Sequence, residues 1–408
     1  MPGRNHSDKF LILGEEIPPC SGGVAQWGYW LGRKLHERGL RVIYAARADY
    51  ARPQAFYGDA FEVHPIPADD WRHRKDRHTL SALWKIWRSH QPGLVLCLTW
   101  KQARIALLLR RLTGWRVAVI AHGMEITKKG SRLRRRLGLR WTFGSADLSL
   151  AVSRYTRERV AEFGVAPEII EVLPCGVDAD RFVPGDGAAV RRRLGLEGLP
   201  VVLTLSRVVA RKGHDLVIEA LHDVRRHVPN ATYVVAGSGN EDYLQHLHEM
   251  TREKQLEDVV HFLGHTPDDD LPGLYSASDV YVMPSRTSDG GGNYEGFGIT
   301  YLEANACGVP VIGADTGGVP DAIADGETGY LVPSEDVRVL ADRIVRLLSD
   351  PVLAHRLGEN GRARVLRSFT WNHLAERFLD LLEARCGPIQ TRRRPHQEAP
   401  EGAATPTH

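Results

Sequence analysis

A glycine-rich turn with two carboxylates, Glu295 and Glu303, has the residue types from which a nucleotide-sugar site can be built. Gly296 and Gly298 lack side chains, so the backbone N–H groups beside them can approach an anion closely. The apolar residues that follow predict a helix, whose positive N-terminal end favours a phosphate. The carboxylates then remain to accept hydrogen bonds from hydroxyls, Glu295 from a sugar ring and Glu303 from a ribose. An ordinary strand-turn-helix with two solvated acids would have the same pattern, so one motif is not sufficient.

Cations that suit a diphosphate follow a second predicted strand, in the segment from Ser206 to Gly213. Arg207 and Lys212 lie five positions apart, just before the expected start of a helix. Departure of a nucleoside diphosphate leaves negative charge on its oxygens, and two fixed cations plus helix-terminal amides can stabilise that charge without a metal. Without the Glu295 segment, a solvated turn would explain these cations equally well.

Two features of the first half of the chain could reach the same ligand. Gly22 and Gly23 follow the first predicted strand, where their backbone can approach a diphosphate. Their loop has neither the spacing of a dinucleotide fingerprint nor that of a Walker loop, which disfavours nicotinamide and ATP chemistry. His122 follows another apolar strand, where it can hydrogen-bond a sugar hydroxyl or meet a developing positive ring. A lone histidine is more often structural, but this position favours function.

Short apolar runs alternate with helix-period segments along the chain, which predicts an α/β protein with parallel sheets. The expected strands of the first half are 10–13, 42–44, 94–98, 117–120 and 148–152. Those of the second half are 201–205, 231–235, 259–262, 280–283 and 309–312, with helices such as 215–227 and 242–254 between them. Right-handed crossovers then give two doubly wound, Rossmann-like domains that face each other across a cleft, with ligands at the carboxyl ends of the strands.

The domain boundary is expected near residues 172–182, where proline and glycine interrupt the alternation. The expected units are an N-terminal domain (1–175), a C-terminal domain (176–368), a helix that packs back on the N-terminal domain (369–387) and a disordered tail (388–408). Asp178 and Asp180 match the Asp-x-Asp pattern that holds a metal in one class of sugar transferases. They lie in the linker rather than at the end of a strand, so we expect no metal site.

The composition is typical of a globular protein of the cytoplasm. The 408 residues are 43% hydrophobic, which is ample for two domains of similar size. None of the five cysteines stands in Cys-x-x-Cys spacing, which argues against a zinc cluster or a disulfide framework and favours a reducing compartment. The N-terminus is polar and no apolar run approaches the roughly 18 residues of a membrane span, so neither a signal peptide nor a spanning helix is expected.

The net charge of +3 hides an asymmetry between the halves. Residues 1–180 contain 29 Lys and Arg against 18 Asp and Glu, whereas the remainder contains 24 against 32. A basic run at 128–140 is interleaved with leucines; its cations are Lys128, Lys129, Arg132, Arg134, Arg135, Arg136 and Arg140. Such a segment could contact an anionic membrane or acceptor, although a solvated helix is the simpler interpretation. We expect no nucleic-acid partner, and the sequence leaves the oligomeric state open.

Together these segments resemble the retaining glycosyltransferases of the GT-B fold, specifically family four, over nearly the whole chain. The resemblance rests on the motifs described above and on further matching segments: Pro174 to Asp178, Ala304 to Pro310, Gly317 to Pro320 and Gly326 to Gly329. The segment from Ser285 to Glu295 is most similar to the branch that includes bacterial phosphatidylinositol mannosyltransferases, which use GDP-mannose. The combination is specific for fold and reaction type and much less so for the sugar.

The resemblance implies a role for each motif. The N-terminal domain would bind the acceptor and the C-terminal domain the nucleotide sugar, with Arg207 and Lys212 on the donor diphosphate and Glu295 against the donor sugar. Glu303 would hold the ribose, and His122 would contact the donor ring from the other domain. The remaining donor-binding positions would be Gly22, Gly23, Gly296, Phe297, Gly298 and Ile299. The family has no assigned covalent nucleophile, and the leaving phosphate is thought to take the acceptor proton; double displacement by a carboxylate is the rival mechanism.

The expected function is therefore retaining transfer of a hexose, with mannose from GDP-mannose favoured, to a hydroxyl of a lipid-linked or small polar acceptor. The resemblance implies no metal or other cofactor, and a cytoplasmic enzyme that could lie at the inner face of the membrane. A UDP-glucose or UDP-N-acetylglucosamine donor is the close alternative. From other classes, a nucleotide-sugar epimerase would need more acid and base groups than His122 and Glu295 supply, and a silent sugar-binding subunit would not need so many matching charges.

Overall fold

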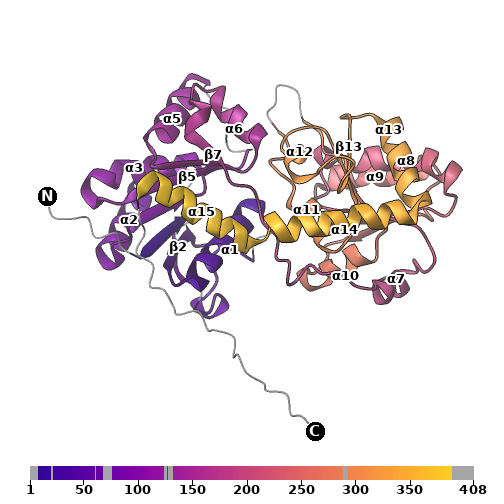
Figure 1. Ribbon diagram of the computed structural model, residues 1–408, viewed down its shortest axis with the longest axis horizontal. Coiled ribbons are helices and arrows are strands. Elements are labelled where there is room, and N and C mark those ends of the chain that lie inside the picture. The colour runs from indigo at the N-terminus through magenta and orange to yellow at the C-terminus, as the bar shows by residue number, and fades with distance from the viewer. Residues whose placement is uncertain are drawn as a thin grey trace, which may run out of the picture.

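The computed structural model describes residues 8–19, 22–59, 61–67, 76–123, 126, 132–287 and 293–387. These residues form two α/β domains, each built on one parallel sheet flanked by helices (Figure 1). The strand order is β3-β2-β1-β4-β5-β6-β7 in the first sheet and β10-β9-β8-β11-β12-β13 in the second. Each order reverses in the middle of the sheet, between β1 and β4 and between β8 and β11, as in doubly wound folds. The predicted pair of doubly wound domains is confirmed.

The first domain contains seven described strands. They are β1 (Lys9–Leu13), β2 (Arg41–Arg47), β3 (Glu62–Ile66), β4 (Leu94–Cys97), β5 (Arg116–Ala121), β6 (Leu148–Ala151) and β7 (Ile170–Val172). The helices between them are α1 (Gly23–Glu37), α2 (Asp76–His90), α3 (Trp100–Thr113), α5 (Arg132–Ser145) and α6 (Arg154–Ala161), with 3-10 turns η1 (Gln54–Phe56) and η3 (Pro167–Ile169).

The second domain repeats this alternation. Its strands are β8 (Val201–Leu205), β9 (Thr232–Ala236), β10 (Val260–Gly264), β11 (Val280–Met283), β12 (Val311–Ala314) and β13 (Gly329–Val332). Its helices are α7 (Ala188–Leu194), α8 (His214–His227), α9 (Glu241–Glu253), α10 (Leu271–Ser276), α11 (Ile299–Ala306), α12 (Val319–Ala322), α13 (Val337–Ser349) and α14 (Pro351–Ser368), with 3-10 turns η4 (Ala210–Lys212) and η5 (Asp268–Asp270). The last described helix is α15 (Trp371–Cys386).

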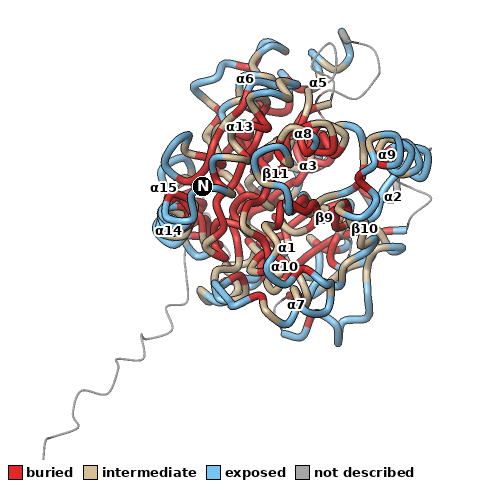
Figure 2. The backbone as a smooth tube through the Cα atoms, turned by 90° about the vertical axis from the view of Figure 1, so that its right-hand side faces the viewer, coloured by how far each residue is buried: buried red, intermediate tan, exposed pale blue. Residues whose placement is uncertain are grey.

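The strands are apolar because helices cover the sheets, and the interior of the molecule is buried (Figure 2). Strands β4, β6, β11 and β12 are buried at every position. The apolar runs predicted from the sequence coincide with ten of the described strands. Three strands were not predicted from the sequence. The edge strand β3 is polar and contains Pro65, β7 has three residues, and β13 begins with a glycine, so none forms an apolar run of ordinary length.

The chain crosses between the domains twice, after β7 and between α14 and α15, and Val177 of the first crossing pairs with Thr370 of the second. Helices α14 and α15 lie in line across both domains (Figure 1). Helix α15 packs on α1, where Arg38 donates hydrogen bonds to Asn372 and Glu376. The C-terminal helix of the described chain therefore lies on the first domain.

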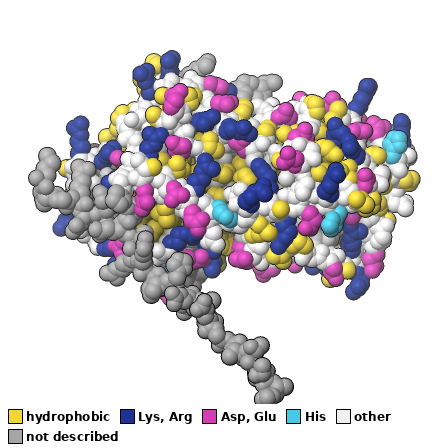
Figure 3. Space-filling view, viewed as in Figure 1, with side chains coloured by type: hydrophobic (Ala, Val, Ile, Leu, Met, Phe, Trp, Pro, Cys, Tyr) yellow, Lys and Arg dark blue, Asp and Glu magenta, His cyan; other side chains and the backbone are white. Residues whose placement is uncertain are grey.

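No helix in the described ranges is both long and apolar enough to span a bilayer. On the face seen in Figure 3, basic and acidic side chains are interspersed over both domains. The opposite net charges of the two halves therefore do not appear as a surface of one sign on that face.

Candidate active site

Loops at the carboxyl ends of three strands bring candidate residues together. His122 follows β5, the loop with Arg207 and Lys212 follows β8, and Glu295 lies between β11 and α11. Strands β8 and β11 are neighbours in the second sheet, so their following loops emerge side by side. This is why Lys212 and Glu295, 83 positions apart in the chain, are in direct contact.

A largely buried ion-pair cluster forms the centre of the site. Glu295 Oε2 lies 2.6 Å from Lys212 Nζ and 2.7 Å from Arg211 Nη1. The three side chains are only 9% (Arg211), 11% (Lys212) and 13% (Glu295) exposed. Burial alone would raise the pKa of Glu295, but the charges of Lys212 and Arg211 and their hydrogen bonds outweigh it and hold the pKa at about 2. The carboxylate is therefore ionised at physiological pH, and it fixes the position of both cations.

Arg211 is a site residue that the sequence pattern did not single out. The sequence pattern assigned Arg207 and Lys212 to the diphosphate and gave Arg211 no role. The structure pairs Arg211 with Glu295. Arg207 is exposed, and its side chain makes no ion pair within the described part of the chain. The available signal was adjacency, because Arg211 and Lys212 lie together on the short 3-10 turn η4.

A second ion-pair network holds this loop in place. The guanidinium of Arg286 binds both carboxylate oxygens of Asp215, at 2.7 Å each, and also donates to the carbonyl of Ala210. Tyr243 donates a hydrogen bond to the same carboxylate at 2.7 Å. Asp215 lies in the first turn of α8, where a negative charge is favourable. The bidentate pair of Arg286 with Asp215 has a defined geometry. Because Arg286 also binds the carbonyl of Ala210, it fixes the position of the turn that carries Arg211 and Lys212.

The start of α11 is open to an anion. Gly298, at its N-cap, has φ +95°, a conformation that glycine adopts readily, and no described side chain caps the helix. The first amides of α11 are therefore available to a ligand. The side chain of Phe297 is buried in the core, so this residue offers only its backbone to the site. The backbone amides of the turn from Gly296 to Gly298 directly follow Glu295 in the sequence.

The first domain approaches the same turn. A Cβ atom at Gly296 would lie 2.2 Å from the carbonyl oxygen of His122, so only glycine permits this approach of the two domains. A Cβ at Gly23, the first residue of α1, would lie 3.8 Å from Ile299 Cδ1 of the second domain. Gly22 is the N-cap of α1. The structure therefore brings both glycine segments and His122 to the start of α11.

His122 is half-buried, and its ring packs edge-on against Trp27 with the ring centres 5.5 Å apart. Burial lowers the pKa of His122 to about 3, so the imidazole is neutral at physiological pH. It can therefore serve as a hydrogen-bonding group rather than a cation.

A charged contact between the domains lies beside this region. Asp321 of α12 accepts hydrogen bonds from the backbone N–H and the Nε of Arg154, both at 2.5 Å. A Cβ at Gly318 would lie 1.9 Å from the carbonyl of Gly296 and 2.8 Å from Ser153 Oγ of the first domain. These contacts show the domains closed around the Glu295 turn.

Glu303 has a separate environment. It lies within α11, where Glu303 Oε2 accepts a hydrogen bond of 2.7 Å from the hydroxyl of Tyr275. Burial raises the pKa of Glu303 to about 6, and the hydrogen bond from Tyr275 only partly offsets this effect. The two carboxylates of the motif therefore differ: Glu295 is ionised and paired with cations, whereas the pKa of Glu303 is raised to about 6.

Comparison with known proteins identifies the family of this chain. Residues 188–364 match the family model described as glycosyl transferases group 1, and residues 21–181 match that of glycosyltransferase family 4. A GDP-mannose-dependent alpha-(1-6)-phosphatidylinositol monomannoside mannosyltransferase of Mycolicibacterium smegmatis is 39% identical in an alignment of length 390 that covers 92% of this chain and 98% of that protein. The protein of the same name from Mycobacterium tuberculosis is 33% identical, with the same coverage of both chains.

Solved structures share the fold at lower sequence identity. Anabaena HepE in complex with UDP and glucose superposes with a TM-score of 0.77 at 21% identity, over 92% of this chain and 99% of that one. Sucrose-phosphate synthase from Thermosynechococcus elongatus gives a TM-score of 0.78 at 24% identity, over 92% and 98% of the two chains. The match over nearly the full length of the mannosyltransferases, together with the two family models, establishes that this chain belongs to the family 4, group 1 glycosyltransferases.

Proposed function

We propose that this glycosyltransferase moves a hexose, with mannose from GDP-mannose as the favoured donor, to a hydroxyl of a lipid-linked or small polar acceptor. The transfer would retain the anomeric configuration and need no metal. The observation that carries the proposal is the cluster of Lys212, Arg211 and Glu295 beside the open start of α11. It combines cations and amides for a diphosphate with a carboxylate for the sugar. The donor preference rests on the GDP-mannose dependence in the names of the similar mannosyltransferases.

The reaction would proceed on one face of the sugar. The bond from the anomeric carbon to the diphosphate oxygen breaks, the acceptor oxygen bonds to that carbon, and the acceptor proton passes to a leaving phosphate oxygen. Lys212 Nζ has three N–H donors, so it can bind Glu295 and a phosphate oxygen at once. Together with the amides of α11 it would stabilise the charge that develops on the diphosphate. Neutral His122 would hydrogen-bond the donor ring.

A double displacement through Glu295 is the competing mechanism. Two cations bind this carboxylate and hold its pKa at about 2, which makes it a weak nucleophile. The pairing therefore favours a positioning role for Glu295. A covalent glycosyl-enzyme on Glu295, trapped by mass spectrometry with a slow donor, would contradict that role.

The donor is tested by slow hydrolysis in the absence of an acceptor. The protein is incubated with labelled GDP-mannose, UDP-glucose or UDP-N-acetylglucosamine, and we expect release of the sugar from GDP-mannose. Activity in excess EDTA should equal that in buffer, because the cluster of Lys212 and Arg211 supplies the charge. Turnover of UDP-sugars with none of GDP-mannose would overturn the donor assignment, and loss of activity in EDTA would overturn metal independence.

The ionisation of Glu303 predicts a pH dependence of donor binding. The ionised carboxylate of Glu303 can accept hydrogen bonds from both hydroxyls of the ribose, whereas the protonated acid has less capacity to accept them. The affinity for the donor should therefore fall as the pH drops below about 6. We expect the KM for the donor to be about tenfold higher at about pH 5 than at about pH 7. Glu303→Gln, whose amide oxygen can still accept from Tyr275, should remove this dependence. A pH profile of KM that is unchanged in the variant would exclude the ribose role.

The raised pKa of Glu303 also has a consequence for folding. Its folded-state value lies above the ordinary value of 4.5, so the folded protein binds the proton more tightly than the unfolded chain does. The contribution of Glu303 to stability is therefore greatest at low pH and is lost as the pH rises from 4.5 through about 6. Glu303→Gln should accordingly raise the thermal unfolding midpoint at neutral pH, as measured by calorimetry.

A basic and apolar surface on the first domain suits an anionic membrane. Along α5, Leu133, Leu137 and Trp141 recur every four residues and are 66%, 60% and 42% exposed. On the neighbouring α3, Leu108 and Leu112 are 59% and 68% exposed. Exposed arginines flank these residues, among them Arg104, Arg136 and Arg140. This α3–α5 surface could insert its leucines between lipids while the arginines bind headgroups.

The basic run predicted from the sequence is only partly described. Lys128 and Lys129 and the side chain of Arg132 lie outside the described residues, and Leu139 is buried in the core rather than exposed. The apolar contribution comes from Leu133 and Leu137, two leucines of that run, and from Leu108 and Leu112 of α3, which the sequence did not indicate.

Replacing Leu133 and Leu137 by serine should weaken binding to vesicles of anionic phospholipid by about tenfold or more, since burial of a leucine is worth about 1.5–3 kcal/mol. Vesicle sedimentation measures the effect. Leu366→Ser is the matched control, because Leu366 is 42% exposed on α14 in the other domain. Equal vesicle binding by the double variant and the wild type would exclude this surface.

A further inference from the structure

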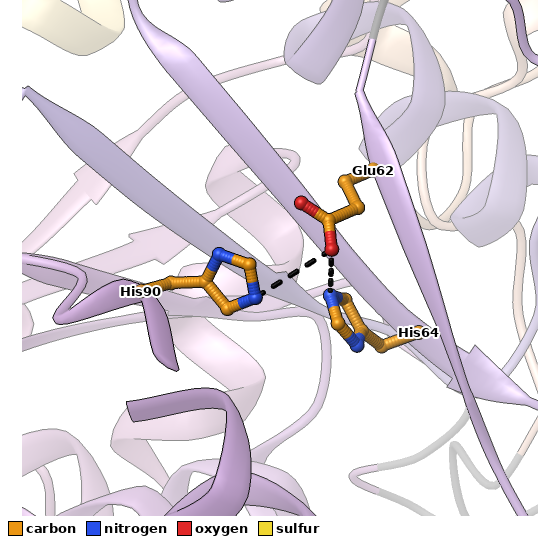
Figure 4. Close-up of side chains that lie close together, drawn as sticks. All are labelled: Glu62, His64 and His90. Atoms are coloured by element: carbon orange, nitrogen blue, oxygen red, sulfur yellow. Dashed lines mark ion pairs between the residues drawn. The ribbon is translucent and has the colours of Figure 1, made fainter. Parts of the chain in front are cut away.

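A cluster of two histidines and a glutamate lies outside the active site, at the edge of the first sheet. Glu62 and His64 stand two positions apart on the edge strand β3, so both side chains lie on one face of the strand. His90 is the last residue of α2. Figure 4 shows the three side chains turned toward one another, with Glu62 and His64 on the strand and His90 at the end of the helix.

The chain topology explains why these residues meet. After β3 the chain returns through α2 before it enters β4, so the end of α2 comes back to the level at which β3 begins. The cluster therefore lies toward the amino end of the sheet, whereas the active site is at the carboxyl end. Three strands separate β3 from β5, which precedes His122.

The geometry is not that of an ordinary ion pair. Glu62 Oε1 lies 2.8 Å from His64 Nε2 and 3.5 Å from His90 Nε2. Despite this short distance, His64 Nε2 is shielded from solvent and makes no hydrogen bond to any described residue. Its N–H direction therefore does not aim at the carboxylate oxygen. One ligand atom from each of the three side chains lies within 4.8 Å of the other two. The three atoms are therefore close enough to bind a single metal ion.

A divalent zinc ion fits such a point. Two imidazoles and a carboxylate are zinc ligands at bond lengths of about 2.0–2.2 Å, and in tetrahedral geometry they stand about 3.3 Å apart. The distances of 2.8 and 3.5 Å from Glu62 Oε1 bracket this value, so small side-chain rotations suffice. The nearby cationic side chains of Lys9 and Arg41 would weaken the affinity of this site for a cation.

We propose that Glu62, His64 and His90 form a zinc-binding site in which the metal ties the edge strand β3 to the end of α2. The fourth position would be filled by water, because these three side chains supply three ligand atoms. The site stabilises the first domain and takes no part in sugar transfer. It stands apart from the proposed function, since it lies toward the amino end of the first sheet and the donor residues lie at the carboxyl ends of the strands.

Zinc binding is tested on the full chain without an affinity tag, because the protein has 18 histidines and a tag would add more. Competition with a chromophoric chelator should show that each chain binds one Zn²⁺ ion tightly. His64→Ala and His90→Ala should each weaken that binding by about 100-fold, and Glu62→Gln by about tenfold. His36→Ala, a half-buried histidine of the same domain outside the cluster, is the matched control and should bind as the wild type does.

Two further measurements keep the proposal testable if a variant folds poorly. Co²⁺ bound to the wild-type protein should give the intense visible absorption of four-coordinate cobalt, and Zn²⁺ should displace it. Zinc should also raise the unfolding midpoint of the wild type but not of His90→Ala, while removal of zinc should leave the initial transfer rate unchanged. Absence of a stoichiometric site, or a site that persists with full affinity in His64→Ala and His90→Ala, would overturn the proposal.

Discussion

Lys212→Ala is expected to lower kcat by about 30- to 1,000-fold, which corresponds to about 2–4 kcal/mol of transition-state stabilisation. Lys212 Nζ is buried next to Glu295 at 2.6 Å, and it stands beside the open amides of α11. A cation in this position acts most strongly when charge develops on the departing diphosphate, so the loss should appear in kcat more than in the KM for the donor. Steady-state kinetics with the preferred donor measures both parameters.

The fold should survive this change, because Arg211 remains 2.7 Å from the same carboxylate and leaves Glu295 compensated. Lys254→Ala is the matched control: Lys254 Nζ pairs with Glu219 at 2.9 Å on the outside of the second domain, and its loss should leave kcat unchanged. Arg211→Ala should also lower kcat, because Arg211 is the second cation of the cluster. Wild-type turnover by Lys212→Ala would refute the phosphate role.

Gly296→Ala is expected to lower kcat/KM by about 100-fold. The new Cβ would lie 2.2 Å from the carbonyl oxygen of His122, so the two domains would have to stay apart at the point where the donor binds. A displacement of about 1 Å in a reacting geometry can cost about 100-fold in rate. The unfolding midpoint should change little, since opening of the domains relieves the clash without disturbing either core. Kinetics together with calorimetric unfolding separates the two effects.

Gly144→Ala provides the control for Gly296→Ala. A Cβ at Gly144 meets no atom within 4 Å, and the residue lies in α5, so alanine should be neutral or slightly stabilising there. If Gly296→Ala retained wild-type kcat/KM, the close approach of His122 to the Glu295 turn would not be needed for transfer.

The sequence predicted most strands because their apolar runs are long enough to be recognised without any knowledge of neighbours. It missed β3 because an edge strand needs no apolar run, and that polar strand carries Glu62 and His64 of the proposed zinc site. The glycine turn at Gly296 and the cations near Lys212 were also recognisable, since the two segments together have the residue types that suit a sugar and a diphosphate.

Pairings between these residues were not predictable from spacing alone. Arg207 and Arg211 are both arginines in the same loop, and only the structure shows that Arg211, on the 3-10 turn η4, pairs with Glu295 while Arg207 is exposed. The exposure of Leu133 and Leu137 and the burial of Leu139 likewise depend on which side of α5 packs against the domain.

The sequence by itself determined the fold class, most of the strands and the segments that bear the chemistry, because apolar periodicity and turn residues are local properties of the chain. The tertiary structure decided the contacts. Strands β8 and β11 become neighbours through a crossover, which brings Lys212 to Glu295 across 83 residues and gives that carboxylate a pKa of about 2. Glu303, eight residues further along, is buried beside Tyr275 and has a pKa of about 6. Burial and charged neighbours set these values, and both depend on the packing of segments that are distant in the sequence.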